Sequence, residues 1–71
     1  MRIDTISAEE VGRRIRAARE ASRLSATDLA AKLGVEWRQI AAWEAGVETP
    51  PFAMLLHLAE ALHAPVAKFL E

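Results

Sequence analysis

The sequence predicts a compact all-α domain of five helices, built around two short helices that a tight turn connects. Apolar residues recur at steps of three and four residues along most of the 71-residue chain, which is the spacing of a helix face. Serine or glycine stands where several of these runs begin or end. The composition is 52% apolar, which is enough for a core. The chain contains no cysteine, so this core must hold without disulfides.

The chain divides into a short N-terminal arm and one folded domain. Residues 1–6 roughly alternate between apolar and polar side chains and suggest a frayed or edge strand, so residues 1–7 are assigned to the arm. Residues 8–71 are assigned to the domain, because helical spacing continues through them without a low-complexity linker. A domain of this size lies near the lower limit at which a single core is sufficient.

The first helix is expected from Ala8 to Ala21. Ser7 begins a capping-box sequence, in which its hydroxyl accepts from the amide of Glu10 and the Glu10 carboxylate reaches back to the helix start. Steps of three and four residues then place one apolar face on the helix and leave most of its arginines outside. The residues on that face are Val11, Ile15, Ala18 and Ser22.

The second and third helices form the central pair. Ser25 caps the second helix, Ala26–Leu33. The negative charge of Asp28 in its first turn interacts favourably with the positive end of the helix dipole. Gly34 can adopt the left-handed conformation that ends this helix and begins a sharp turn. The third helix is expected over Trp37–Ala45 and ends at the next glycine. The core residues expected from this pair are Leu29, Ala30, Leu33, Ile40 and Trp43.

Two further helices complete the domain. The fourth is expected over Pro51–Leu62, with Thr49 as its cap and prolines in its first turn. It is apolar on most sides, and His63 should stand just beyond its end. A short fifth helix begins at Pro65. Its apolar residues at helical spacing are Val66, Phe69 and Leu70.

Several functional classes are excluded by what the sequence lacks. His57 and His63 are separated by six residues, whereas two imidazoles that share one metal on a helix stand three or four residues apart. No paired carboxylates, Ser/His/Asp set or glycine-rich phosphate loop is present, so we expect no catalytic residue, no metal and no cofactor. No apolar run is long enough to span a membrane, and the N-terminus does not read as a signal peptide. We therefore expect a cytoplasmic protein that is not an enzyme.

The charge of the chain is small and uneven. The formal net charge is −1, which argues against a protein that binds polyanions without specificity. Residues 1–40 hold eight Lys and Arg against six Asp and Glu, whereas residues 41–71 hold one against four. Any surface for nucleic acid should therefore draw on the N-terminal half.

The central pair of helices resembles the Cro/phage-repressor helix-turn-helix family, often called Xre-type. The likeness extends over about Val11–Leu70 and implies a lambda-repressor-like fold with the third helix in the DNA major groove. It further implies double-stranded DNA as partner and a homodimer that represses transcription at an inverted repeat. The positions that carry it are Leu24-Ser25, Leu29-Ala30, Leu33-Gly34-Val35, Ile40, Trp43-Glu44 with Gly46 two residues on, Pro50, and Leu55-Leu56-x-Leu58-Ala59-x-Ala61-Leu62.

The resemblance implies which side chains would contact DNA. Arg38 can form two hydrogen bonds with guanine, a contact that discriminates by about 1–3 kcal/mol. Gln39 lies to one side and could bind adenine or a phosphate. Trp37 is unusual at its position and has three interpretations: a contact with a sugar or thymine methyl, an anchor for a protein partner, or a ring folded back onto the domain. The base-reading set is Trp37, Arg38, Gln39, Ala41 and Ala42, and the backbone set is Ser25, Thr27, Lys32, Ala45 and Thr49.

Two structural roles are also implied. Arg19 and Glu44 stand where the family places an ion pair between the first helix and the recognition helix, and the alternative is two separate surface charges. A dimer would need apolar surface from the last helix, at Val66, Phe69 and Leu70, with Met54 as an addition and Ile3 and Ile6 of the arm as a second option. Phe69 could instead close the core.

Three departures from the family pattern favour a different class of function. Ala26 replaces a residue that commonly grips a phosphate, and Glu36 replaces the usual Ser/Thr cap of the recognition helix. The loop that begins at Val47 lacks the Lys or Arg often found there. These three positions predict few phosphate contacts. The alternative is a protein-interaction module, such as an antitoxin-like partner, that uses the helix-turn-helix scaffold and has little affinity for DNA.

Overall fold

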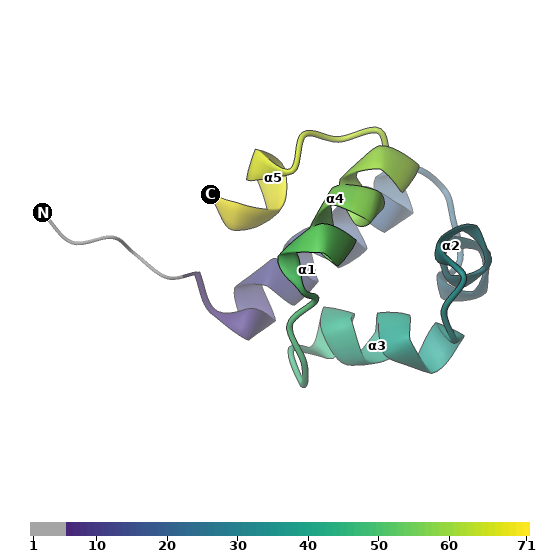
Figure 1. The fold of residues 1–71 in the computed structure, drawn as a ribbon, viewed down its shortest axis with the longest axis horizontal. Helices are drawn as coiled ribbons and strands as arrows, with labels where there is room; N and C mark the ends of the chain where they lie inside the picture. The colour runs from purple at the N-terminus through teal and green to yellow at the C-terminus, as the bar shows by residue number, and fades with distance from the viewer. Residues whose placement is uncertain (1–5) are drawn as a thin grey trace, which may run out of the picture.

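A computed structural model describes residues 6–71, and in this part of the chain it contains five helices and no strand (Figure 1). The predicted all-α, five-helix fold is confirmed. The predicted arm and its Ile3 lie mostly outside the described residues, which begin at Ile6. The helices are α1 (Ala8–Ala21), α2 (Ala26–Leu33), α3 (Trp37–Ala45), α4 (Phe52–Ala61) and α5 (Ala67–Leu70).

The start of α1 differs in one detail from the predicted capping box. The hydroxyl of Ser7 accepts from the Glu10 amide at 3.1 Å, as expected. The Glu10 carboxylate does not reach back to the helix start, because it accepts from the guanidinium groups of Arg13 and Arg14 one turn further on. These two hydrogen bonds, the one from Arg13 foremost, lower the pKa of Glu10.

The start of α2 holds a complete capping box. The amide of Asp28 donates to the Ser25 hydroxyl at 2.9 Å, and the amide of Ser25 donates to the Asp28 carboxylate at 3.1 Å. The second bond lowers the pKa of Asp28, because it stabilises the ionised carboxylate. At the other end, Gly34 has φ of +71° and ends α2 in the left-handed conformation, as predicted.

The fourth helix is shorter than predicted by one residue at each end. Pro51 occupies the cap position, with φ −59° and ψ 156°, and no side chain caps the helix. The expectation that Thr49 is the cap is wrong, because the buried Pro50 and then Pro51 intervene before the first helical residue. His63 has φ of +54° just beyond the end of α4, the position predicted for it.

The core is formed by apolar residues from all five helices. Phe69 is fully buried and holds α5 against α1, so it belongs to the core and is not available for contact with a second molecule. Of the two interpretations of Phe69, the core one is right. The buried apolar residues are Val11, Ile15, Ala18, Leu29, Ala30, Ile40, Trp43, Leu55, Leu58, Ala59, Leu62 and Phe69.

The arrangement of helices leaves α3 at one edge of the molecule. In Figure 1, α3 runs across the lower edge, and α2 beside it is seen nearly end-on, so their axes are steeply inclined. α3 packs chiefly on α1 and α2. Its side away from them is free of other elements in the described part of the chain.

Candidate nucleic-acid interface

The short helix α3 has a buried inner face and an exposed outer face. Ile40 is fully buried, and Trp43 is 4% exposed. The outer positions are exposed or half-buried, because a nine-residue helix at the edge of the molecule can bury only one of its faces. The expected contact residues exposed on this helix are Trp37, Arg38, Ala41 and Ala45, and Ala42 is half-buried.

A glycine in the middle of α1 fixes the distance between α1 and α3. A β-carbon at Gly12 would stand 2.4 Å from the carbonyl oxygen of Trp43 and 2.6 Å from that of Glu44. Only glycine therefore allows the two helices to approach so closely. Sequence reasoning missed this residue. A glycine inside a helix costs about 1 kcal/mol in stability relative to alanine. Its presence within a predicted helix therefore indicates a packing requirement, and this signal could have identified Gly12.

An ion pair joins the same two helices. The Arg19 guanidinium donates to the Glu44 carboxylate through Nε at 2.6 Å and Nη2 at 3.0 Å. It also donates to the carbonyl of Leu24 at 2.8 Å. The side chains of Arg19 and Glu44 are only 13% and 10% exposed, and the hydrogen bonds with Glu44 raise the pKa of Arg19. Arg19 is thus engaged inside the domain and is not free to contact DNA.

The N-terminal end of α3 carries two exposed side chains that contact each other. The Cζ atom of Arg38 lies 5.6 Å from the centroid of the Trp37 ring, within the range of a cation–π interaction. Trp37 is 50% exposed, so its ring is not part of the core. Arg38 makes no hydrogen bond or ion pair with residues 6–71 and keeps its donors available.

Gln39 is held by a partner that sequence reasoning did not identify. Its Nε2 atom donates to the Glu48 carboxylate at 2.7 Å, and its side chain is half-buried. This bond connects α3 to the loop that follows it. The pair borders a hollow along one side of α3, lined by Val35, Glu36, Arg38, Gln39, Ala42 and Glu48.

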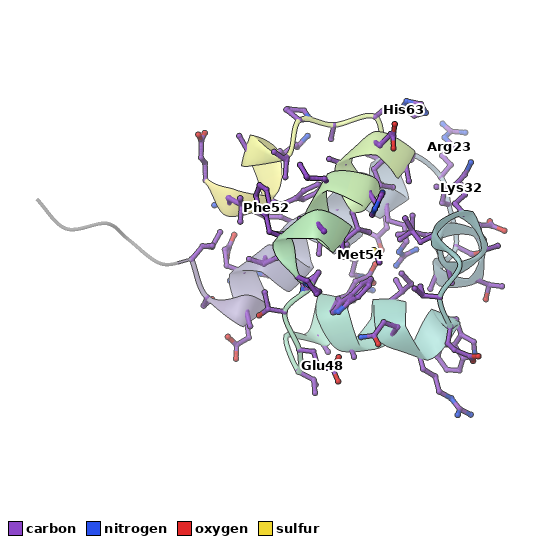
Figure 2. All side chains as sticks on the ribbon, in the orientation of Figure 1. Arg23, Lys32, Glu48, Phe52, Met54 and His63 are labelled. Carbon is purple, nitrogen blue, oxygen red and sulfur yellow. The ribbon has the colours of Figure 1, made fainter. Side chains whose placement is uncertain are left out.

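The expected backbone contacts do not all lie near α3. Thr27 and Thr49 are exposed, and Ser25 already uses its hydroxyl as the cap of α2. Figure 2 places Lys32 beside Arg23, toward His63 and on the side of the molecule away from Glu48. The structure therefore does not bring Lys32 to the outer face of α3.

The three positions that depart from the family pattern offer no phosphate-binding side chain in the structure either. Glu36 stands at the cap position of α3 and makes no side-chain cap hydrogen bond, so its carboxylate is exposed. Ala26 is half-buried, and Val47 is 77% exposed. Over residues 36–49 the sequence has one cation, Arg38, and three carboxylates. The outer face of α3 is therefore not strongly basic.

Exposed apolar surface is concentrated on α4 more than on α5. Phe52 is 59% exposed and Leu56 is 46% exposed, one helical turn apart. On α5, Leu70 is 37% exposed and Val66, just before it, is half-buried. Met54 is also half-buried. The apolar composition of α4 on most sides was the signal for this surface, but the sequence did not show which side would remain open.

Residues 6–71 contain no group of three or more His, Cys, Asp or Glu residues placed to hold a metal ion. No helix in this described range is long and apolar enough to cross a membrane.

The sequence of this chain matches a known family, and its fold is similar to those of known proteins. The model of a family described as a helix-turn-helix domain matches residues 10–70. The structure is similar to the restriction-modification controller protein C.AhdI from Aeromonas hydrophila, with a TM-score of 0.83 and 27% identity over 89% of this chain and 96% of that one. It is also similar to the clp gene regulator ClgR from C. glutamicum, with a TM-score of 0.84 and 23% identity over 93% of this chain and 86% of that one.

A similar fold also occurs as part of a larger chain. The hydroxypropylphosphonic acid epoxidase from S. wedmorenis matches 96% of this chain with a TM-score of 0.85 and 20% identity, but only 36% of the epoxidase is covered. At that level of identity the likeness concerns the fold alone. No curated protein sequence gives a significant match.

Proposed function

The chain belongs to the helix-turn-helix domain family, and we propose from this premise that it binds double-stranded DNA as a sequence-specific transcriptional regulator. The observation that carries the proposal is the outer face of α3, which no other helix of residues 6–71 covers and which presents the guanidinium of Arg38, without a hydrogen-bond partner in that range. The names of C.AhdI, a controller protein, and ClgR, a gene regulator, support the same assignment.

The proposed mechanism is occupation of a DNA site by α3. The helix enters the major groove, where Arg38 donates to the O6 and N7 atoms of guanine. Backbone contacts come from Thr27, Thr49 and the start of α2 at Ser25, together with the exposed end of α3 at Ala45. The regulator acts as a repressor without a cofactor, since a bound domain excludes polymerase from the operator. This role on DNA implies a cytoplasmic location and no catalytic activity.

The regulator is proposed to act as a homodimer on an inverted repeat. A single domain covers one half-site, and dimers of this type bind two half-sites about one helical turn apart. Phe52 and Leu56 on α4 supply the exposed apolar surface for self-association, with Leu70 beside the end of the chain. These residues replace the buried Phe69 in the expected interface.

A second candidate function is a protein-interaction module. It is favoured by the half-exposed Trp37 and by the carboxylates of Glu36 and Glu48, which would repel phosphates. In this case Trp37 would anchor a protein partner, and affinity for DNA would be low.

The test is selection from a randomised duplex pool at two salt concentrations, followed by sequencing of the retained duplexes. Enrichment of an inverted repeat with half-sites about one turn apart supports the dimeric regulator. Retention without enrichment would mean contacts with the backbone only, and its salt dependence would report how many phosphates are contacted. No retention at low salt would overturn the proposal in favour of the protein-interaction module.

A further inference from the structure

The outer face of α3 offers DNA an apolar surface. Trp37, Ala41 and Ala45 are spaced four residues apart and therefore form one ridge along the helix. All three are exposed, and half of the Trp37 surface remains accessible. Val47, directly after the helix, is 77% exposed. None of these side chains can accept a hydrogen bond, and only the indole N–H of Trp37 can donate one.

The polar side chains of α3 are mostly engaged inside the domain. Gln39 donates one of its two amide N–H groups to the Glu48 carboxylate at 2.7 Å, an exposed bond that ties its side chain to the loop after α3. Glu44 accepts two hydrogen bonds from the Arg19 guanidinium. Arg38 is the one cation of the helix, and it has no hydrogen-bond partner among residues 6–71. This surface would therefore present the bases with one strong hydrogen-bond donor, the Arg38 guanidinium, surrounded by the methyl and aromatic carbons of the ridge.

Major-groove chemistry determines what such a surface can distinguish. Guanine and adenine each present two hydrogen-bonding groups there, cytosine presents its amino donor beside a bare C5–H, and thymine presents an acceptor and its C5-methyl group. Apolar side chains in the groove therefore favour the methyl group and lose free energy where an unpaired polar edge is covered. A 5-methylcytosine carries the same methyl group at the same position.

We propose that α3 reads C5-methylated pyrimidines, with Trp37 contacting the methyl group of the base next to the guanine bound by Arg38. The stacking of Arg38 on Trp37, at 5.6 Å from Cζ to ring centroid, supports this adjacency because it holds the two readers side by side. Ala41, one turn further along the ridge, contacts a further methyl group, and Ala45 lies at the end of the ridge beside the DNA backbone. The inference rests on the proposed DNA-binding function and specifies which chemical feature of the operator gives it specificity.

The experiment uses the wild-type protein and the duplex that the selection enriches. Each thymine is replaced in turn by deoxyuridine, which removes only the C5-methyl group and keeps base pairing and the O4 acceptor. Binding should weaken by about fourfold at each thymine whose methyl is buried, which corresponds to one methyl-sized group removed from water. Replacing a contacted thymine–adenine pair by 5-methylcytosine–guanine should retain more affinity than replacement by cytosine–guanine.

Variants then assign the effect to the ridge. Trp37→Ala should abolish the deoxyuridine effect at one position next to the conserved guanine of the selected site, while the far-UV circular dichroism stays that of the wild type. His57→Ala, an exposed change on α4, should leave every deoxyuridine effect in place. Specific binding that is indifferent to every deoxyuridine substitution would overturn the inference alone. Failure to bind any duplex would overturn the proposed function and this inference together.

Discussion

Gly12 of α1 lies so close to α3 that a β-carbon in its place would stand 2.4 Å from the carbonyl oxygen of Trp43. That distance is far shorter than a van der Waals contact, so the two helices can adopt their observed spacing only with glycine at this position. α3 makes its most extensive packing with α1, not with its sequence neighbour α2. The position of the outer face is therefore determined largely by a residue that precedes the helix-turn-helix pair in the sequence.

Gly12→Ala should destabilise the domain strongly. Alanine is the better helix former by about 1 kcal/mol, but the added methyl group collides with the backbone of α3, and overpacking of this kind costs about 1–3 kcal/mol or more. Gly34→Ala is the matched control, because it meets no atom within 4 Å and adds only the strain of φ +71°, about 1–2 kcal/mol. Urea unfolding measures both. A Gly12→Ala variant as stable as the wild type would show that α1 and α3 can separate freely.

Glu44→Ala should cost up to about 3 kcal/mol, the lower end of the range for buried pairs, because it leaves the part-buried Arg19 guanidinium without its carboxylate partner. Arg19→Ala should cost a similar amount, and the double variant should lose clearly less than the two single losses added together. Arg16→Ala is the control, since it breaks the exposed pair with Glu20, and such surface pairs contribute about 0.5 kcal/mol or less. Additive losses in the thermodynamic cycle would contradict coupling between Arg19 and Glu44.

Arg38→Ala should abolish sequence preference and leave the melting temperature almost unchanged. Within residues 6–71 the exposed guanidinium makes no hydrogen bond or ion pair and lies over the Trp37 ring, so its removal should affect DNA binding more than the fold. Competition between the selected duplex and a scrambled one measures the preference. Lys32→Ala should retain that preference, because Lys32 lies away from α3 (Figure 2). A large loss of thermal stability in Arg38→Ala would assign this residue a structural role.

Glu36→Ser should increase both stability and affinity for DNA. Serine can cap α3, which Glu36 does not do, and a side-chain cap contributes about 0.5–2 kcal/mol. The change also removes a carboxylate from the end of the helix that approaches phosphates. Thermal unfolding and binding at two salt concentrations measure the two effects, with Glu60→Ser on α4 as the control for simple loss of negative charge. Weaker binding by Glu36→Ser would mean that this carboxylate accepts from a base, for which the cytosine amino group is the available donor.

Stability should fall when the pH drops below about 4, the ordinary range for carboxyl groups. The pKa of Asp28 is lowered in the folded state by its bond from the Ser25 amide, and that of Glu10 is lowered by its bonds from Arg13 and Arg14. Groups with a lowered folded pKa stabilise the fold above their unfolded pKa, and this contribution is lost as the pH falls through the folded value. Asp28→Asn should reduce the decrease between pH 7 and pH 3, measured by urea unfolding. An unchanged decrease would exclude the capping box of α2 as a source of acid sensitivity.

The helix pattern could be predicted from the sequence because its signals are local. Ser7, Ser25 and Gly34 act on groups within one turn of themselves, and α1, α2 and α3 have the predicted bounds. The errors at Thr49 and Glu10 arose where a local signal had a competitor. Consecutive prolines displaced the expected cap, and nearby arginines captured the carboxylate.

The candidate site was harder to predict, because exposure and partnership depend on how the helices pack. Gln39 has a side chain that could bind a base, yet it donates a hydrogen bond to Glu48, nine positions away. Glu48 lies in a loop, and the sequence alone does not determine the course of that loop. Lys32 stands on a helix of the pair, but its direction around α2 is set by the packing of Leu29 and Ala30. Phe52 and Leu56 belong to a helix that is apolar on most sides, so its open side was known only once the packing of the whole domain was known.

The division of α3 into two faces has a consequence for how the protein can change over evolutionary time. Ile40, Trp43 and Glu44 hold the helix in place, whereas Trp37, Arg38 and Ala41 bear no part of the core. Under the proposed DNA-binding function, substitutions at the second set would alter the recognised DNA without a loss of folding that would need compensation elsewhere. New specificities are thus reachable by single steps through stable intermediates. The same independence makes this helix a suitable site for engineering a family of orthogonal regulators on one unchanged scaffold.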